Sequence, residues 1–273
     1  MLRLFSRKWM LTTILVVAAV AVMVRLGFWQ LDRLEARRAF NARVQAQLDQ
    51  PALELHGVAL EVNLTEMDYR AVVVEGEYDF SQEVALRNQA REGQWGVDLI
   101  TPLRIAGSDR AVLVNRGWIP GDDFQSGNWE KYAEPGRVKI NGMIRASQSK
   151  PDFGRRSDPT PAPGQGRLEA WNFVNVTGIA NQVSYPLLPI YIQQAPDPAW
   201  TGMPYRSLPH LELTEGSHLG YALQWFTFAT ILGLGYPFYI RKEELHKNAA
   251  GAARAAKKNP LIPIDQSRRG SSS

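Results

Sequence analysis

His218 is the side chain in this sequence whose type and neighbours best fit ligand chemistry. On a helix, Tyr221, Trp225, Phe228 and Leu232 fall within about 80° of His218, on one face. A neutral imidazole beside such an aromatic stripe could supply an axial ligand to iron in a planar macrocycle. The competing interpretation is an aromatic belt at a membrane surface, where Trp and Tyr collect without any ligand. The residues alone leave both interpretations open and favour the belt.

Other chemistry finds little support in the sequence. The chain has no cysteine, which excludes thiolate metal sites, thiol redox chemistry and covalent haem attachment through C-x-x-C-H. His210 precedes His218 by eight residues, a separation that is not a recognised metal-ligand spacing. The sequence contains no G-x-S-x-G, H-E-x-x-H or Gly-rich phosphate loop. We therefore expect a protein that is not an enzyme.

Two apolar runs frame the chain, at residues 9–31 and 218–240. About 20 helical residues cross the roughly 30 Å hydrocarbon core, so both runs are long enough to be transmembrane helices. The first run could instead be a secretory signal, but no small-residue cleavage site follows it. Gln224 lies inside the second run, where a polar side chain favours contact with a partner helix. We expect two spans that pack together.

The distribution of charge predicts the topology. Residues 1–8 carry three basic groups, and residues 241–273 carry eight basic groups against three acidic ones. Positive charge near span ends stays in the cytoplasm, so both termini are placed there, with the tail from residue 241 expected to be disordered. Residues 32–217 hold 19 basic and 24 acidic groups and are expected to be periplasmic. The high pI thus belongs to the tails and does not imply nucleic acid. A bacterial inner membrane is the expected location.

The segment between the spans is rich in predicted strands. The first span is expected to continue as an amphipathic helix that Pro51 ends. Short runs rich in Val and Ile, separated by turn residues, follow at 69–78, 83–89, 95–105, 110–119 and 137–146. A Pro- and Gly-rich loop is expected at 150–167, a short helix within 173–183 and a further strand at 187–194. The pattern predicts an α+β membrane protein with an antiparallel barrel or sandwich between terminal helices.

Four motifs in order give the chain a family resemblance. They are LGFWQLDRLEAR after the first span, LRNQAREGQWGVDLITPL and VLVNRGWIP in the middle, and SHLGYALQWF at the second span. Together they resemble the Surfeit locus protein 1 family, over roughly residues 10–245. The resemblance implies a membrane protein that assists assembly of haem-copper cytochrome c oxidase. Bacterial members of that family are thought to bind haem a and to help place it in the catalytic subunit.

The resemblance also implies site residues. The matching positions are Gly27, Trp29, Gln30 and Arg33 in the first motif, Asn115, Arg116, Gly117 and Trp118 in VLVNRGWIP, and His218, Tyr221, Gln224 and Trp225 in the last. By this resemblance His218 is the ligand of the haem iron, and the expected haem a site comprises His218, Tyr221, Trp225, Gln224, Trp29, Gln30 and Arg33. The chain departs from the family at Ser217, where Asn is usual, and at Arg37, where Lys is usual.

The implied partners are cytochrome c oxidase subunit I, haem a synthase and the lipid bilayer. An alternative remains, a two-span structural scaffold or polysaccharide chain-length regulator that binds no haem. Such proteins are predominantly helical between their spans, whereas this segment is predicted to be rich in strands.

Overall fold

The computed structural model describes the chain except for residues 1–5, 151–156, 159–165 and 259–273. It divides into two compact units, of which the first comprises residues 1–39 and 214–273 and the second residues 40–213. The second unit thus lies inside the segment 32–217 that we expected to be periplasmic. Most of the predicted Pro-rich loop at 150–167 lies outside the described residues.

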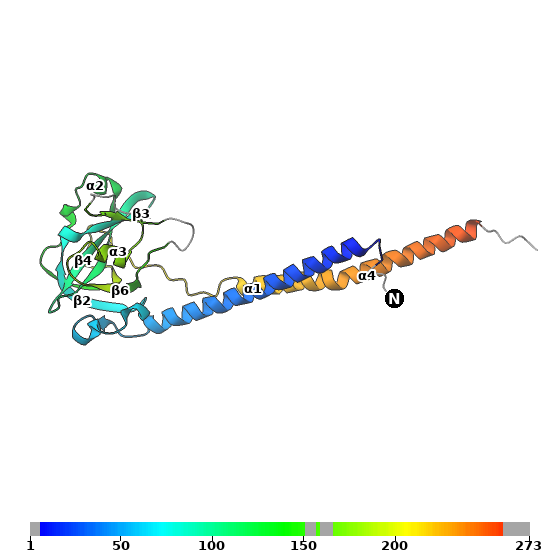
Figure 1. Ribbon diagram of the computed structural model, residues 1–273, viewed down its shortest axis with the longest axis horizontal. Coiled ribbons are helices and arrows are strands. Elements are labelled where there is room, and N and C mark those ends of the chain that lie inside the picture. Colours follow the sequence, from blue (N-terminus) through cyan, green and yellow to red (C-terminus); the bar gives the residue numbers. More distant parts are fainter. Residues whose placement is uncertain (1–5, 151–156, 159–165, 259–273) are drawn as a thin grey trace, which may run out of the picture. The chain divides into compact units, whose positions relative to one another are not determined.

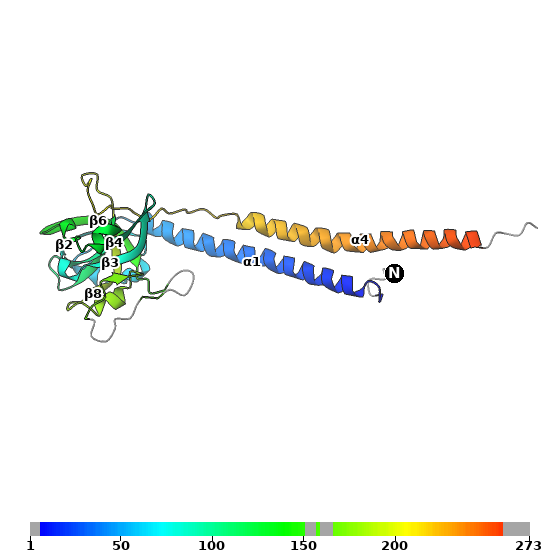
Figure 2. The same ribbon diagram turned by 90° about the horizontal axis from the view of Figure 1, so that it is seen from above.

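The first unit is built from two long helices, α1 (Met10–Leu48, to Ala39 in this unit) and α4 (His218–Lys258), which lie side by side (Figures 1 and 2). They run antiparallel, since Trp9 contacts Tyr239 near one end and Gln30 contacts His218 near the other. Buried and half-buried side chains recur along α1 at alternating intervals of three and four residues, which is the spacing of a helix–helix seam. The seam, and not propensity alone, accounts for the length of both helices.

α1 is the one helix among the described residues that is long and apolar enough, by length and composition, to cross a membrane. This supports membrane association. The predicted second span, 218–240, is helical throughout, but polar residues such as Gln224 and Thr227 interrupt its apolar run, and its crossing of a membrane stays a prediction.

The tail prediction is wrong for residues 241–258, because α4 continues as a helix to Lys258. These residues are mainly Ala, Lys, Arg and Glu, which favour helix in any context. An ion pair of 2.8 Å between Lys247 and Glu243, four residues apart, adds support. Residues 259–273 lie outside the described part of the chain.

The second unit is a β-barrel. Its elements are β1 (Leu53–Glu54), β2 (Ala71–Tyr78), β3 (Val84–Arg91), β4 (Gln94–Ile105), β5 (Ala111–Pro120), α2 (Gly121–Gln125), β6 (Arg137–Ala146), β7 (Ala170–Trp171), α3 (Val176–Ala180) and β8 (Leu187–Gln194). Short 3₁₀ turns occur at Gly57–Leu60, Leu64–Glu66, Phe80–Gln82 and Glu130–Tyr132. The five strand runs predicted from residue 69 to 146, the short helix and the strand at 187–194 are confirmed. The two-residue strands β1 and β7 are too short to leave a periodic signal.

The barrel closes through five strands. The sheet order is β1-β2-β6-β8-β5-β4-β3-β7, and an additional pairing of β2 with β4 closes the ring. In chain order these five are β2, β4, β5, β6 and β8, and their arrangement is a Greek-key barrel of the OB type. The predicted barrel with antiparallel pairing is confirmed in part, because β2–β4, β2–β6, β3–β4, β4–β5 and β6–β8 are antiparallel, whereas β1–β2, β3–β7 and β5–β8 are parallel. The long connection after β6 allows β8 to enter beside β5 in the same direction.

The barrel interior is apolar and tightly closed. Fifteen buried side chains form its main cluster, with Val112, Ile144, Ile190 and Ile192 fully inaccessible to solvent. Alternation along β2 places Val72, Val74 and Tyr78 inside, as a period of two requires. This packing makes β4 and β5 a rigid platform for the polar side chains that these strands carry.

Candidate functional site

His218 is the first residue of α4 and is half-buried against α1. Its Nδ1 lies 2.9 Å from Oε1 of Gln30. An amide oxygen can only accept, so this bond places a proton on Nδ1, and in the neutral imidazole Nε2 then keeps a free lone pair. Among the described residues, no hydrogen-bond partner occupies Nε2. The ring is therefore held in the tautomer that can bind a metal through Nε2.

Close packing of α1 against α4 fixes this geometry. Gly27 lies directly beneath Phe226, since a Cβ on Gly27 would stand 2.6 Å from its ring. Phe28 meets the same ring edge to face, with centroids 5.4 Å apart. On α4 the small residue Ala222, one turn after His218, is buried, and Ala229 is buried further along the helix. A glycine and an alanine at these positions let the helices approach until Gln30 reaches His218.

Of the remaining predicted site residues, Tyr221 and Trp225 share one edge of α4, whereas Gln224, Trp29 and Arg33 are exposed away from it. Trp225 is half-buried and meets Phe228 edge to face at 6.3 Å, on the edge of the helix that carries Tyr221. Gln224 is exposed, and so is Trp29, whose ring lies 5.9 Å from the guanidinium of Arg33.

The structure thus brings His218 and Gln30 together and does not gather all seven residues. Gln224 does not face α1, because its position falls between the seam positions 222 and 225, and its contact with a partner helix stays a prediction.

Beyond the apolar parts of α1 and α4, Arg38 and Glu215 form a two-bond ion pair, with N–O distances of 2.7 and 2.8 Å. The hydrogen bonds from Arg38 lower the pKa of the Glu215 carboxyl. Arg37, one of the two departures from the family pattern, donates from Nε to the carbonyl of Thr214. These bonds tie α1 to the segment that enters α4, three residues before His218.

The motif VLVNRGWIP has a different setting, inside the barrel. β5 carries a β-bulge here, because Leu99 pairs with Gly117 and Ile100 with Asn115, which leaves Arg116 without a ladder partner. Asn115 stabilises the bulge, since its Oδ1 accepts from the amide of Gly117 at 3.0 Å. Arg116 follows Val112 and Val114 at intervals of two, so its side chain points to the same inner face of the barrel.

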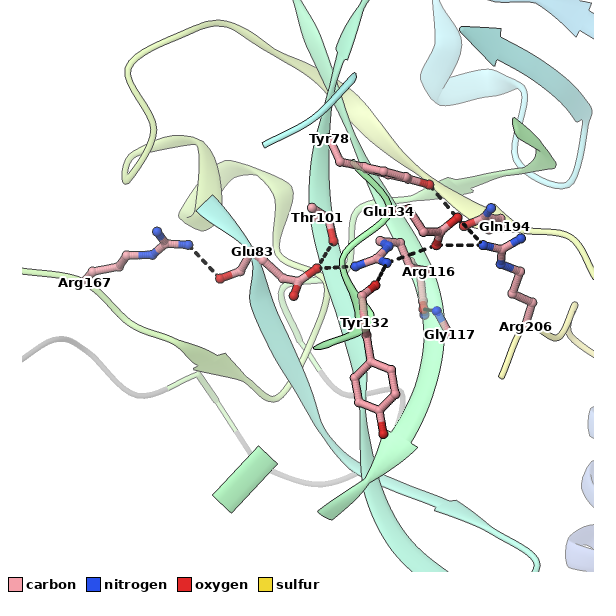
Figure 3. A network of polar contacts seen from close by, with 11 residues as sticks. Tyr78, Glu83, Thr101, Arg116, Gly117, Tyr132, Glu134, Arg167, Gln194 and Arg206 are labelled. Atoms are coloured by element: carbon pink, nitrogen blue, oxygen red, sulfur yellow. Dashed lines mark hydrogen bonds and ion pairs between the residues drawn. The ribbon is translucent and has the colours of Figure 1, made fainter. Parts of the chain in front are cut away.

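Arg116 is fully buried among carboxylates (Figure 3). Its Nη1 donates to Glu83 at 2.7 Å, and its Nη2 donates to Glu134 at 3.0 Å and to the carbonyl of Tyr132. Arg206 donates to both oxygens of Glu134 at 2.7 Å. Two cations and two carboxylates therefore alternate, which offsets much of the cost of burying charge.

The same bulge holds the segment that returns toward α4. Gly117 has a φ of +119°, and a Cβ there would lie 2.4 Å from the carbonyl oxygen of Tyr205. Trp118 exchanges backbone hydrogen bonds with Tyr205, at 3.0 and 2.8 Å. Only glycine permits both the dihedral angle and the close approach.

Sequence reasoning missed Glu83, Glu134 and Arg206, which complete the buried charge network. They come from three distant parts of the chain, so no local spacing could have indicated them. The resemblance found Arg116 alone, as one residue of a motif.

Neither region contains a conventional metal centre. Within the described residues, no three His, Cys, Asp or Glu side chains converge as metal ligands. His210 is exposed, and its Nε2 lies 4.0 Å from Glu212. An ion bound through His218 would thus have to bring most of its coordination with it, as iron does in a haem.

The comparison with protein families agrees with the motif resemblance. The model of the SURF1 family matches residues 17–230, which include α1 from residue 17, the whole barrel and α4 up to residue 230. A SURF1-like protein of Caenorhabditis elegans is 24% identical over 256 residues, covering 87% of this chain and 76% of that protein. A SURF1-like protein of Rickettsia felis is 26% identical, over a match that covers 85% of this chain and 98% of that protein.

Human Surfeit locus protein 1 is 24% identical over 216 residues, covering 74% of this chain and 68% of the human protein. The matches are spread over the two long helices and the barrel, and are not confined to one motif. The chain belongs to the SURF1 family.

Proposed function

We propose that this protein is an assembly factor for haem-copper cytochrome c oxidase, which receives haem a and aids its insertion into subunit I. Family membership supports the assembly role. The observation that carries haem binding is the 2.9 Å bond between His218 Nδ1 and Gln30, which leaves Nε2 free. Haem a synthase is the proposed donor and subunit I the proposed acceptor.

The residues present fit an axial ligand site. Ligating histidines almost always donate their second ring N–H to an acceptor, which fixes the tautomer and the ring orientation. Gln30 supplies that acceptor from the neighbouring helix. Aromatic side chains flank His218 on α4, at Tyr221 and Trp225, and suit a flat apolar ligand.

When bound, haem a would supply an iron centre for His218 Nε2, and its redox chemistry would belong to the oxidase that receives it. The protein's own residues perform a binding and orienting task. Gln30 holds the imidazole, and the Gly27–Phe226 contact keeps the two helices close. No covalent bond of the cargo is made or broken in this role, so we propose that the protein is not an enzyme.

The proposed topology has two spans, α1 and the apolar part of α4, in a bacterial inner membrane. The antiparallel pairing of these helices supports it, since two antiparallel spans put both basic termini on one side. The barrel would then lie in the periplasm. His218 would stand at the periplasmic end of its span, where the charged Arg38–Glu215 pair follows outside the apolar region.

Co-expression with the enzymes of haem a synthesis tests the function. The full chain, purified in detergent, is expected to carry a haem absorption spectrum that His218→Ala abolishes. A matched control is His210→Ala, because His210 is exposed and lies outside the helical pair. A colourless wild-type protein, or a spectrum unchanged in His218→Ala, would contradict direct ligation and favour the scaffold that binds no haem.

A further inference from the structure

An apolar groove runs along the paired helices of the first unit. It has a volume of about 420 Å³ and is lined by Met23 of α1 and by Phe228, Leu232, Gly235, Tyr236 and Tyr239 of α4, among others. The proposed function uses none of these residues. The groove therefore needs an explanation of its own.

The groove suits a ligand that is apolar along its length. Its polar Tyr236 hydroxyl is already bonded to the hydroxyls of Thr13 at 2.8 Å and Thr12 at 3.0 Å. Gly235 leaves room, because a Cβ there would meet no atom within 4 Å. Apart from the tyrosine hydroxyls at its rim, the site offers a guest apolar contact surface.

The groove is continuous with the face that carries Tyr221 and Trp225. Positions 221, 225, 228, 232, 235 and 239 follow one another at intervals of three and four, which keeps them on one helix edge. At about 1.5 Å per residue, Phe228 lies about 15 Å along α4 from His218. Trp225 bridges the interval and contacts Phe228 edge to face at 6.3 Å. An aromatic track thus leads from His218 into the groove.

We propose that this groove holds the isoprenoid tail of haem a, while His218 holds the iron. The inference rests on the proposed function and deepens it, since it explains how the protein would select a haem with an isoprenoid tail over one without. Haems a and o carry a long isoprenoid chain, whereas haem b does not. That chain is the apolar, extended part of the ligand, and the groove is the apolar, extended feature that follows His218.

The expected selectivity is modest. Lipid and detergent tails are as apolar as the groove, so an isoprenoid chain gains only the closer contacts that a shaped surface provides. We therefore expect the wild-type protein to bind haem o about tenfold more tightly than haem b, a factor equal to about 1.4 kcal/mol.

Titration of the purified full chain with haem o and haem b, followed by absorption, tests the proposal. Gly235→Phe adds a ring at a groove position where a Cβ would meet no atom within 4 Å, and it is expected to bring the two affinities to parity while leaving haem b binding unchanged. Ile231→Trp, which also projects into the groove, is a second blocking variant in case the first does not fold. The matched control is Gly220→Phe, since Gly220 is equally open but does not line the groove.

The outcomes separate the two proposals. Equal wild-type affinities for haem o and haem b, or a preference that both groove variants retain, would overturn the tail site and leave ligation by His218 intact. Loss of the preference in Gly220→Phe as well would also overturn it, because the effect would not depend on the groove. A wild-type protein that binds neither haem would contradict the proposed function itself.

Discussion

The two family motifs that contain the most chemically capable side chains, SHLGYALQWF in α4 and VLVNRGWIP in β5, are used in different ways. Arg116 in β5 has both of its terminal nitrogens occupied by Glu83, Glu134 and a backbone carbonyl, and it is fully buried. His218 in α4 has one ring nitrogen bonded to Gln30 and the other free of protein partners among the described residues. In the barrel motif both terminal nitrogens of Arg116 are bonded within the protein, whereas in the helical motif one ring nitrogen of His218 is available to a ligand.

The difference shows how to separate stability from binding within one family signature. A side chain whose polar atoms are nearly all satisfied by the protein stabilises the fold, and its loss damages the fold. A side chain held by one bond, with its second nitrogen open, is positioned for something outside the protein. Arg116 and Gly117 are therefore expected to matter for the barrel, and His218 and Gln30 for the ligand.

Arg116→Met should cause the largest effect. The substitution removes one cation from a buried network and leaves Glu83 and part of Glu134 without their partner. Breaking a buried pair by removing one member costs about 3–5 kcal/mol of unfolding free energy. Thermal or chemical denaturation of the purified full chain, followed by circular dichroism, measures the loss.

Arg137→Ala is the control for that prediction. Arg137 pairs with Glu75 at 3.1 Å, but both side chains are at least half exposed, so the loss should stay below about 1 kcal/mol. Equal effects of the two substitutions would mean that the buried network does not stabilise the barrel.

Gly117→Ala should come next, at about 1–3 kcal/mol. The new Cβ faces a positive φ and the carbonyl oxygen of Tyr205 at 2.4 Å, and backbone must move to admit it. Gly107→Ala is the matched control, because φ there is +75° and a Cβ would meet no atom within 4 Å. The denaturation midpoint should fall further in Gly117→Ala than in Gly107→Ala, and the excess measures the close approach to Tyr205 together with the less accessible φ of +119°. A midpoint shift in Gly117→Ala no larger than that in Gly107→Ala would show that the contact with Tyr205 adds no cost to the substitution.

Sequence periodicity predicted most of the fold for a physical reason. The strand runs from 69 to 146 are short, rich in Val and Ile and separated by turn residues, and the helical runs repeat every three and four residues, so each element leaves a local signal. The parallel pairing of β5 with β8 left none, because the direction of pairing depends on a connection of about 70 residues and not on either strand. The helix from 241 to 258 was missed because charge and small residues were interpreted as disorder, although the same residues favour helix.

The candidate site was only partly predictable. The resemblance supplied both His218 and Gln30 as motif positions, but 188 residues separate them, and only the antiparallel helix pairing shows that they touch. It also supplied Gln224 and Arg33, which the fold leaves exposed. Helical spacing correctly related Tyr221, Trp225 and Phe228, but it could not show that their edge leads into a groove completed by Met23 of α1.

Gln30→Ala sharpens the comparison on the helical side. Without the amide oxygen, the His218 ring loses the acceptor that orients it and fixes its proton on Nδ1. Loss of such a supporting bond typically weakens metal binding about 10–100-fold. The measurement is a haem titration followed by absorption, with the denaturation midpoint expected to change little.

Two variants test whether orientation is the cause. Gln30→Glu keeps an acceptor and should restore binding relative to Gln30→Ala. Gln45→Ala removes an amide from an exposed position on the same helix and should leave haem binding unchanged. Equal affinity in wild type and Gln30→Ala would show that His218 needs no positioning partner.

Asp98→Asn should have the smallest effect, and its sign depends on pH. Burial raises the pKa of the Asp98 carboxyl, and the hydrogen bond from Asn115 only partly opposes this. Because the pKa is higher in the folded state, the folded protein binds the proton more tightly than the unfolded chain does. The stabilisation from that proton is present below the ordinary carboxyl pKa and is lost as pH rises through the raised value.

Asn mimics the neutral acid and can still accept from Asn115. The midpoint difference, variant minus wild type, should therefore grow from near zero in acid to a positive value at neutral pH. Asp109→Asn, at an exposed position, should show no such trend, and a flat difference for Asp98→Asn would mean that this carboxylate is solvated despite its place beside the bulge.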